Sequence, residues 1–339
     1  MTWEKRGWTV AEMQNHLKPW LNSLRPDLIP INETEHYEQG WMGTGGWLGK
    51  HVWKQWSNPN QVVHVVRKKS ELFSHQVQWD DPLPRVQHVW LNAWDMSLAH
   101  SPAQSLKVNF PLLKKSLEWA IRCDAVITFT SSLSVWAASE KSTFEAYEYD
   151  DLNSANRVWG GYAISKWMAE SWLQKAGVPF QVVRPGLLTF DGAIFPPHDP
   201  FLDTYRAWPS LKSEQRFGLN DERTDWSPTD QVALGISNIL KNPLSGRIVQ
   251  CASPKGVLLK DWAYALEQLG PCHAEKEELK RARRHLKRVF VPVNELERRQ
   301  DMAQANDWHF DTSEWKKATG ITWSSPSIED IIHHCRTQK

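Results

Sequence analysis

Tyr162 and Lys166 are the residues whose types and spacing most directly suggest chemistry. They stand four positions apart in YAISKWMAESWLQKAG, which predicts a helix, so both side chains should project from one face. A tyrosine with its ordinary pKa near 10 is a poor acid–base catalyst at neutral pH, but a lysine ammonium one turn away favours the phenolate. The pair therefore suggests a tyrosine that exchanges a proton with a substrate; the alternative is an ordinary solvated helix face.

Three serines precede this helix at the end of an apolar stretch. Ser131, Ser132 and Ser134 follow AVITFT, which predicts a buried strand that runs into a turn. A hydroxyl at such a strand end would be placed to lie beside Tyr162 and bind a substrate carbonyl oxygen. The alternative is a serine-rich turn whose hydroxyls cap local backbone groups.

A glycine-rich loop contains Gly43, Gly46 and Gly49. In a dinucleotide-binding turn, such glycines allow a tight bend, the approach of backbone to a pyrophosphate, and close packing of the following helix. The pyrophosphate would then lie at the positive N-terminal end of a helix beginning near Trp47. The preceding segment His36–Met42 should be the first strand, although it is unusually polar for a buried central strand.

The elements that would position these residues alternate between strands and helices. Such alternation is typical of an α/β protein with a mostly parallel sheet, and together with the glycine loop it predicts a Rossmann-like, doubly wound fold. The expected strands cover residues 61–67, 76–81, 86–94, 125–135, 178–186 and 246–254, and the expected helices cover 105–122, 162–177 and 229–240. The connections on either side of residues 76–81 are too short for crossover helices, so either loops replace the helices there or this segment is not a strand.

The chain divides into three expected parts. Residues 1–35 predict a helical segment followed by a proline-containing linker. Residues 36–186 and 228–254 carry the alternation and should form the dinucleotide-binding Rossmann domain. Residues 187–227 and 255–339 are expected to form a smaller, mainly helical C-terminal substrate-binding subdomain.

The composition is that of a globular protein and argues against several classes. A net charge of +1 gives no reason to expect nucleic acid or a membrane surface as a partner. No apolar run approaches the roughly 18 residues of a membrane span, and the N-terminus lacks a secretory signal pattern. Four cysteines without pairing or metal-like spacing suit a reducing cytosol, so we expect a cytoplasmic protein.

Tryptophan is the unusual component, with 21 residues against 17 glycines. One interpretation is an aromatic-lined pocket for a flat substrate. The other, which we favour, is that tryptophan fills core positions where leucine or phenylalanine would serve, as at Trp90, Trp119 and Trp172.

Basic residues gather at the end of the second expected strand. Arg67, Lys68 and Lys69 stand where a carboxylate would bind a ribose 2′-hydroxyl and a cation favours a 2′-phosphate. They therefore favour NADPH over NADH; the alternative is a set of solvated loop charges. Asp80, after the next segment, is expected to border the adenine.

The order of glycine loop, strand-end serine, Tyr-x-x-x-Lys and a strand ending Arg-Pro-Gly resembles the extended short-chain dehydrogenase/reductases. The resemblance implies a role for each matching residue. Ser132 stands at the position of the family's catalytic hydroxyl, Tyr162 at that of the proton donor, and Lys166 at that of the residue that also holds the nicotinamide ribose. The turn near the nicotinamide is matched by Arg184, Pro185 and Gly186.

A closer resemblance, over about residues 36–335, is to the terminal thioester reductase domains of fungal non-ribosomal-peptide-synthetase-like enzymes and α-aminoadipate reductase. The similar segments are VQHVWLNAW, GYAISKWMAE, DWSPTDQVA, RIVQCASPKGVLLKDW and HFDTSEWKKATG. Leu91 stands where histidine is usual, Met42 stands where a threonine usually precedes the first glycine, and the adenine side is shortened. The residues that the resemblance implies as cofactor contacts are Gly43, Gly46, Trp47, Leu48, Gly49, Arg67, Lys68, Asp80, Asn92, Ala93, Lys166, Arg184, Pro185 and Gly186.

The reaction implied is hydride delivery from NADPH to an acyl carbonyl, in secondary metabolism. Ser132 and Tyr162 would hydrogen-bond the oxygen on which negative charge develops. From a thioester the thiol leaves and an aldehyde is released, and a second hydride gives the alcohol. The alternatives are an extended short-chain reductase of a free aldehyde or ketone, and a degenerate member acting as a non-redox cyclase or regulatory NADPH binder. The polar first strand and Met42 favour the degenerate member, whereas the intact Ser132, Tyr162 and Lys166 oppose it.

The expected partner is a small-molecule or carrier-protein-bound acyl substrate that another enzyme has activated. The basic run KRARRHLKR, residues 280–288, is first a solvated helix face and second a docking patch for an acidic carrier protein or its phosphate. No aromatic pattern supports nucleic-acid binding. His333, His334 and Cys335 lack further ligands nearby, so no metal site is expected.

Overall fold

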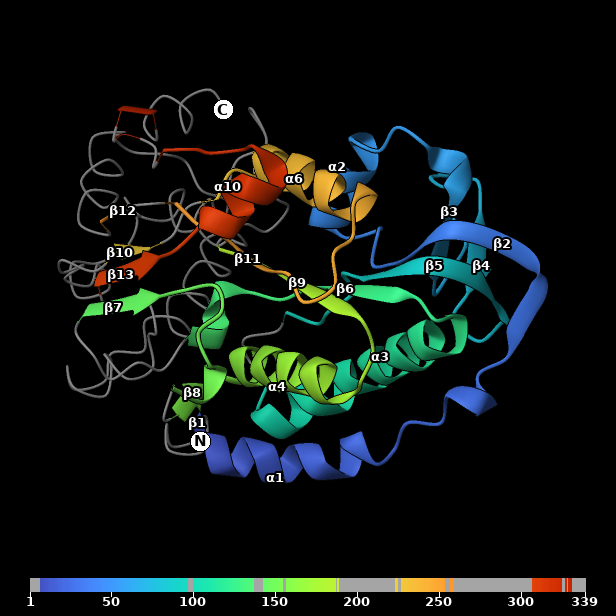
Figure 1. The fold of residues 1–339 in the computed structure, drawn as a ribbon, viewed down its shortest axis with the longest axis horizontal. Coiled ribbons are helices and arrows are strands. Elements are labelled where there is room, and N and C mark those ends of the chain that lie inside the picture. The colour runs from blue at the N-terminus through green and yellow to red at the C-terminus, as the bar shows by residue number, and fades with distance from the viewer. Residues whose placement is uncertain are drawn as a thin grey trace, which may run out of the picture.

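The computed structural model describes residues 7–96, 100–136, 143–154, 157–186, 188, 223–224, 227–253, 257–258, 307–324, 327 and 329–330. Its centre is a seven-stranded parallel sheet with helices on both faces (Figure 1). The sheet order is β11-β9-β6-β5-β2-β3-β4, so the chain leaves β2 in one direction through β3 and β4 and in the other from β5 onward. The predicted Rossmann-like, doubly wound α/β fold is confirmed. The strands are β2 (Ile31–Met42), β3 (Val62–Val66), β4 (Gln76–Gln78), β5 (Leu83–Leu91), β6 (Val126–Thr130), β9 (Phe180–Pro185) and β11 (Ile248–Cys251).

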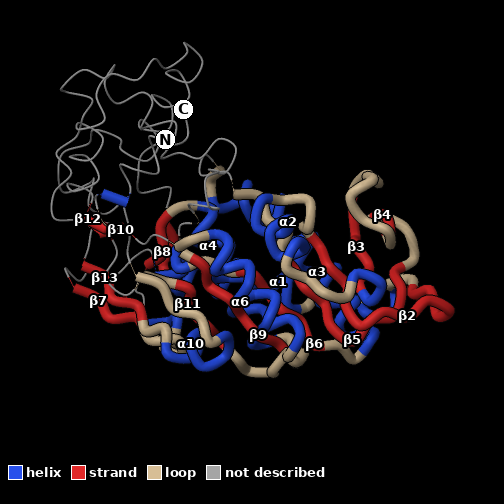
Figure 2. The backbone as a smooth tube through the Cα atoms, turned by 90° about the horizontal axis from the view of Figure 1, so that it is seen from above, coloured by secondary structure: helices blue, strands red, loops and turns tan. Residues whose placement is uncertain are grey.

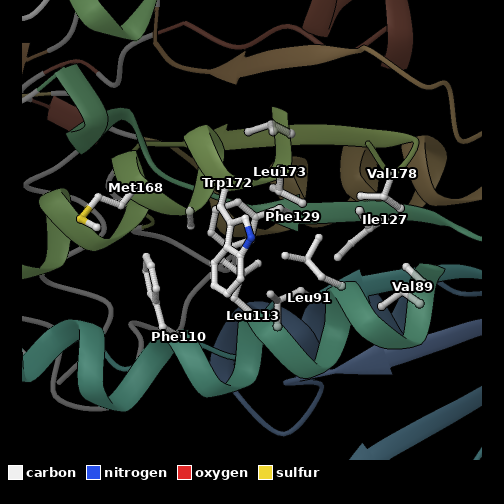
Figure 3. Close-up of a cluster of buried hydrophobic side chains, with 14 of the residues drawn as sticks. Val89, Leu91, Phe110, Leu113, Ile127, Phe129, Met168, Trp172, Leu173 and Val178 are labelled. Atoms are coloured by element: carbon white, nitrogen blue, oxygen red, sulfur yellow. The ribbon is translucent and has the colours of Figure 1, made fainter. Parts of the chain in front are cut away.

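Two sets of helices cover the sheet, and each set buries its own apolar core (Figure 1). One face carries α1 (Val10–Leu21), α3 (Pro102–Cys123) and α4 (Gly161–Lys175), and the other carries α2 (Trp47–Lys54), α6 (Thr229–Lys241) and α10 (Ser313–Thr319). Figure 3 shows the core between α3, α4 and the sheet, with Phe110, Leu113, Phe129 and Trp172 among its side chains. α3 begins with a capping box between Ser101 and Gln104, which satisfies two backbone donors at its first turn.

The N-terminal segment is attached to the sheet domain through secondary structure of its own. β1 (Gly7–Thr9) pairs antiparallel with β8 (Arg157–Trp159), and α1 packs against α4. The predicted N-terminal helix is therefore present as α1. The expected linker is wrong in its second part, because β2 already begins at Ile31 and pairs there with Leu83 of β5.

The polar first strand fits the sheet because only its last part is buried. Of the twelve residues of β2, the first eight are exposed or partly exposed and the four from Gln39 to Met42 are buried. The Gln39 side chain donates from Nε2 to the Leu240 carbonyl at 3.0 Å and accepts from Trp41 Nε1 at 3.3 Å. A buried amide whose hydrogen bonds are made costs little, so the sequence is compatible with a central strand.

Gly40 leaves the space that a tryptophan of α3 fills. A Cβ at Gly40 would lie 2.1 Å from Cη2 of Trp119. The Trp119 indole N–H donates to the Pro84 carbonyl at 2.8 Å, which fixes the ring over the strand. Trp90, Trp119 and Trp172 are all fully buried, so tryptophan fills core positions there as predicted.

The short stretch between β3 and β5, residues 67–82, contains β4 and no helix. β4 pairs in parallel with β3 at the edge of the sheet. Loops therefore replace both crossover helices, and residues 76–78 do form a sheet strand. Figure 2 shows this region at one end of the molecule, with β7 and β13 at the other.

Two small sheets accompany the large one. β7 (Thr143–Ala146) pairs in parallel with β13 (Asp307–Phe310), and β10 (Arg223–Thr224) pairs antiparallel with β12 (Val257–Leu258). Gln250 of β11 joins the first pair to the large sheet, because its Nε2 donates to the carbonyls of Ala146 at 2.9 Å and Asp311 at 3.0 Å. Most of residues 187–227 and 255–339 lies outside the described residues, so the subdomain boundaries stay a prediction.

Gly40→Ala should destabilise the fold, because a methyl group would overlap the Trp119 indole and neither the strand nor the buried ring can move freely. Overpacking of this kind costs about 1–3 kcal/mol. Gly45→Ala is the matched control, since nothing lies within 4 Å of a Cβ there. Urea unfolding followed by tryptophan fluorescence measures both, and equal stability of the two variants would contradict the packing argument.

Candidate active site

The glycine loop lies at the point of the sheet where the strand order reverses. It follows β2, which has β5 on one side and β3 on the other, and it leads directly into α2. In doubly wound folds the crevice at this reversal, outside the carboxyl ends of the strands, is where ligands bind. The glycine loop therefore follows the carboxyl end of β2, the strand that the sequence predicts before it.

Two of the three glycines are required by space. Gly43 has a φ of +95°, and a Cβ there would lie 2.3 Å from the backbone nitrogen of Ala93. A Cβ at Gly49 would lie 2.5 Å from the Gly43 carbonyl oxygen, so this glycine lets α2 pack against the loop. Gly46 is the N-cap of α2, and no side chain caps this helix end. Uncapped N–H groups at a helix N-terminus suit an anion such as a phosphate.

Residues after β5 hold the loop from behind. The backbone nitrogens of Asn92 and Ala93 donate to the Met42 carbonyl at 2.8 and 2.9 Å, and Asn92 Nδ2 donates to the Gly43 carbonyl at 3.2 Å. Met42 itself is buried in the apolar core, so only its backbone takes part. The loop keeps its shape with methionine at this position, because backbone carbonyls make these bonds.

Side chains within and beside the loop also have defined places. Thr44 Oγ1 lies 3.0 Å from Nδ1 of His64 on β3, and burial lowers the His64 pKa to about 3, so this histidine is neutral. Trp47 Nε1 donates to Thr229 Oγ1 at 3.3 Å, which ties α2 to α6. Leu48 is buried in the core beneath α2.

A cavity of about 390 Å³ opens beyond the ends of β3 and β4. Arg67 and Asp80, both predicted as cofactor contacts, line it from the strand ends, and α3 closes the other side. Its lining residues are Arg67, Gln78, Trp79, Asp80, Asp81, Val108, Pro111 and Leu112. Lys68, which follows Arg67 in the chain, is exposed and does not line the cavity.

Ser132 and Tyr162 come together as predicted, with Lys166 one turn further along α4. The Ser132 hydroxyl lies close enough to the Tyr162 phenol to lower its pKa. The Lys166 Nζ lies 5.7 Å from the centre of the Tyr162 ring and donates to the Thr130 carbonyl at 2.6 Å. Tyr162 and Lys166 thus share a helix face above the carboxyl end of β6.

Lys166 is buried among aromatic rings. Its Nζ lies 4.4 Å from the centre of the Trp94 ring and 4.6 Å from that of Phe129, and the residue is 2% exposed. Burial lowers the Lys166 pKa well below its usual value, and the Glu170 carboxylate opposes that shift. Burial raises the Tyr162 pKa to about 12, and the Ser132 hydroxyl opposes that rise. The neighbouring hydroxyl and the neighbouring charge therefore favour the ionised forms that burial disfavours.

The structure separates the three serines by their partners. Ser131 Oγ donates to Glu170 Oε1 at 2.5 Å, whereas the Ser132 hydroxyl acts on Tyr162. The backbone nitrogen of Ser134 donates to Ser132 Oγ at 3.2 Å, so the turn after β6 orients the Ser132 hydroxyl.

The Arg184 side chain turns into the protein. It is fully buried, its Nη2 lies 2.7 Å from Glu170 Oε2, and its Nη1 donates to the Glu148 carbonyl at 3.2 Å. Pro185 is paired with Cys251 of β11, and the nitrogen of Gly186 donates to the Cys251 carbonyl at 3.1 Å. Pro185 and Gly186 therefore continue the pairing of β9 with β11, and the Arg184 guanidinium bonds buried groups inside the protein.

Two residues of the site were not selected from the sequence, Trp94 and Glu170. Glu170 follows Lys166 by four positions, as Lys166 follows Tyr162, so helical spacing already placed all three on one face. Trp94 is held by its Nε1, which donates to Ser165 Oγ at 3.1 Å. The cation–π contact depends on the β5–α3 loop, which no local pattern predicts.

Some predicted features lie beyond the described residues. These are the basic run 280–288 and the cluster His333, His334 and Cys335. Across the described parts of the chain, no group of three or more residues could hold a metal ion, and no helix is long and apolar enough to cross a membrane.

The fold and this geometry define a Rossmann-fold protein with a dinucleotide-type glycine loop and a serine–tyrosine–lysine arrangement at the same sheet edge. A family model described as male sterility protein matches residues 75–212. No curated protein sequence matches the chain.

Solved structures share the fold at low sequence identity. The terminal R domain from the myxalamid PKS-NRPS biosynthetic pathway has a TM-score of 0.71 at 16% identity, over 96% of this chain and 97% of that one. The Aureusimine biosynthetic cluster reductase domain has a TM-score of 0.64 at 15% identity, over 97% of each chain. The Bordetella bronchiseptica enzyme WbmG in complex with NAD and UDP has a TM-score of 0.58 at 13% identity, over 89% of this chain and 94% of that one.

These matches agree with the resemblance inferred from the motifs: the family model covers residues 75–212, and the solved structures share the predicted fold.

Glu148 gives the fold a pH dependence that can be measured. Its buried carboxylate accepts from the nitrogens of Gln250, Glu314 and Trp315, and burial raises its pKa from 4.5 to about 7. Between these values the folded protein holds a proton that the unfolded chain has lost, so the free energy of unfolding falls as pH rises through this window. A shift of this size corresponds to about 3 kcal/mol.

Glu148→Gln removes this titration, so its stability should fall less steeply between pH 4.5 and 7 than that of the native protein. Urea unfolding at a series of pH values measures the difference. Glu71→Gln, the same change at an exposed position, is the control and should follow the native curve. If the free energy of unfolding of Glu148→Gln changes with pH in parallel with that of the native protein, the raised pKa is wrongly assigned to Glu148.

Proposed function

We propose that this protein is an NADPH-dependent reductase that converts an acyl thioester or related carbonyl to an aldehyde or alcohol. The observation that carries the proposal is the placement of the Ser132 hydroxyl beside Tyr162, one helical turn from Lys166, at the sheet edge that holds the glycine loop. Two hydroxyls at this place suit a carbonyl oxygen. The likeness to reductase domains of biosynthetic pathways supports a thioester as the substrate and secondary metabolism as the setting.

The residues of the crevice fit a dinucleotide. Gly43 and Gly49 leave the backbone bare at the loop, and α2 begins there without a side-chain cap, so a pyrophosphate has both room and N–H donors. Bound NADPH would supply the hydride. Asn92 and Ala93 would act by bracing the loop, and the Pro185–Gly186 turn would border the nicotinamide end.

The adenosine end would lie in the cavity beyond β3 and β4. Arg67 lines it, and the exposed Lys68 follows Arg67 in the chain, which supports recognition of a 2′-phosphate. Asp80 would lie on the adenine side of the same cavity.

The chain's own residues account for the polar part of the reaction. Ser132 and Tyr162 would bind the carbonyl oxygen and stabilise the negative charge that forms on it. Tyr162 would then give its proton to this oxygen, and the Lys166 ammonium would stabilise the phenolate that remains. When the substrate is a thioester, the hydroxyl of the adduct would return its proton to the Tyr162 phenolate as the carbon–sulfur bond breaks, and the leaving thiolate would take up a proton from water.

The acyl group would arrive either as a small molecule or on an acidic carrier protein. The reductase domains that share this fold belong to multi-enzyme pathways, and this supports a carrier-bound substrate. The basic run at residues 280–288 is the proposed docking patch.

Tyr162→Phe should abolish most turnover, because it removes the proton donor and one of the two oxygen contacts. General acid catalysis of this kind is worth about 10²–10⁴-fold. NADPH oxidation is measured with an acyl thioester and, separately, with an aldehyde, and NADPH affinity is measured by fluorescence titration.

The variant should bind NADPH with native affinity, and Tyr149→Phe, an exposed tyrosine, should keep native turnover. Oxidation with aldehyde alone would favour the free-carbonyl reductase. Undetectable NADPH binding at millimolar concentration would contradict the reductase proposal.

Arg67→Ser should weaken NADPH binding by roughly 10-fold or more, because a charge-assisted hydrogen bond to the 2′-phosphate is lost. NADH binding should stay the same, since NADH has no such phosphate. Lys54→Ser, which removes an exposed cation at the far end of α2, is the control. A parallel loss of affinity for both cofactors would show that Arg67 does not read the phosphate.

A further inference from the structure

A buried charge network lies directly beneath the proposed catalytic residues. Glu170, on α4, and Arg184, on β9, are both completely buried, and the guanidinium approaches the carboxylate at 2.7, 3.1 and 3.2 Å. Ser131, at the end of β6, donates a hydroxyl to the same carboxylate at 2.5 Å. One carboxylate thus joins a helix to two neighbouring strands.

The network meets the proposed catalytic residues through two consecutive positions of the chain. The Thr130 carbonyl accepts from Lys166 Nζ at 2.6 Å, and the next residue, Ser131, donates to Glu170. Ser132 follows immediately, and its hydroxyl lies beside Tyr162 and lowers the pKa of that phenol. Two successive turns of α4 therefore hold the strand end that presents the Ser132 hydroxyl.

The charges around Lys166 come from three elements. Glu170 is on α4 itself, Arg184 is on β9, and Glu148 follows β7 and reaches Arg184 through its backbone carbonyl. Tyr162 is the neighbouring titratable group on the same helix face. Among the described carboxylates, Glu170 is the one that raises the Lys166 pKa, against the lowering of that pKa by burial.

We propose that Glu170 is a positioning residue of the reductase, which stabilises the Lys166 ammonium, neutralises Arg184 and, through Ser131, fixes the strand end that carries Ser132. This rests on the proposed function. A buried ion pair alone is weak evidence for such a role, because apolar residues often replace it without loss of stability. Here the same carboxylate also accepts a hydrogen bond from Ser131 and carries a negative charge one helical turn from Lys166, and an apolar pair reproduces neither the hydrogen bond nor the charge.

Glu170→Gln keeps the shape of the side chain and removes its charge. Two cations, Lys166 and Arg184, then remain without their shared anion, so the Lys166 ammonium should lose its proton at a lower pH, by roughly one pH unit or more. The basic limb of the kcat/KM profile should move to lower pH by the same amount, because the phenolate of Tyr162 loses its stabilising cation.

The double variant Glu170→Gln with Arg184→Met is the matched control, because it removes one negative and one positive charge together. It should return the Lys166 titration most of the way to the native pH. It also keeps the test usable where Glu170→Gln alone fails to fold with an unpaired buried arginine. In that case the double variant is compared with Arg184→Met, which leaves Glu170 without its partner and should raise the Lys166 midpoint.

Two readouts separate this inference from the proposed function. The first is a ¹³C NMR titration of lysine-labelled protein, with the Lys166 signal assigned by its loss in Lys166→Arg; it requires no turnover. The second is the pH profile of NADPH oxidation. A shifted Lys166 midpoint supports the role of Glu170 in the charge state of Lys166 even where the native protein reduces nothing. The inference is overturned if Glu170→Gln leaves the Lys166 midpoint and the basic limb of the pH profile unchanged while the native protein turns over NADPH. That result would not contradict the proposed reductase function.

Ser131→Ala tests the mechanical part of the same proposal. It removes the bond to Glu170 without altering any charge, so it should lower kcat through a misplaced Ser132 hydroxyl while the Lys166 titration and NADPH affinity stay native. A native kcat in this variant would refute the positioning of Ser132 through Ser131.

Discussion

A buried lysine ammonium is the feature around which the rest of the site is organised. Lys166 is 2% exposed, and removal of a charge from water to such a place is costly unless other groups replace the lost hydration. Three kinds of group do so: the Thr130 carbonyl, the faces of Trp94 and Phe129, and the carboxylate of Glu170 one turn away. They come from β6, from the loop after β5 and from α4. The charge therefore requires that these elements meet at one place, and that place is also where Tyr162 and Ser132 meet.

The same requirement extends outward to the smaller sheet. Arg184 bonds the Glu148 carbonyl, and the Glu148 carboxylate accepts from the backbone of β11 and from the first turn of α10. Buried polar groups of this kind must be satisfied together, because each one left unpaired costs more than a bond contributes. The polar network therefore links Arg184 of β9, which borders the site, to β11 and to the first turn of α10, which come later in the chain.

Local pattern was sufficient for those parts of the site that depend on one element each. Helical spacing placed Tyr162 and Lys166 on one face, and a turn between strand and helix required Gly43 and Gly49. Contacts between distant segments were not predictable in this way. His36–Met42 looked unsuitable as a buried strand because the pattern does not show where the sheet ends and solvent begins. The suitability of Gly40 depends on Trp119, and the inward turn of Arg184 depends on Glu170, and both partners come from a helix packed across the strand.

The cavity at the end of β3 carries charges of both signs, and their sum bears on the cofactor. Asp80 and Asp81 line it, and a carboxylate there would suit the ribose 2′-hydroxyl of NADH. Both carboxylates act on Lys115 of α3, where they oppose the lowering of its pKa by burial. Lys115 also donates to the Trp79 carbonyl and lies over the Trp79 ring, so this cation is held against a residue that lines the cavity. With one cation facing the two carboxylates, Arg67 in the wall and the exposed Lys68 and Lys69 that follow it in the chain make the whole cluster positive, which supports the proposed use of the cofactor with the additional phosphate.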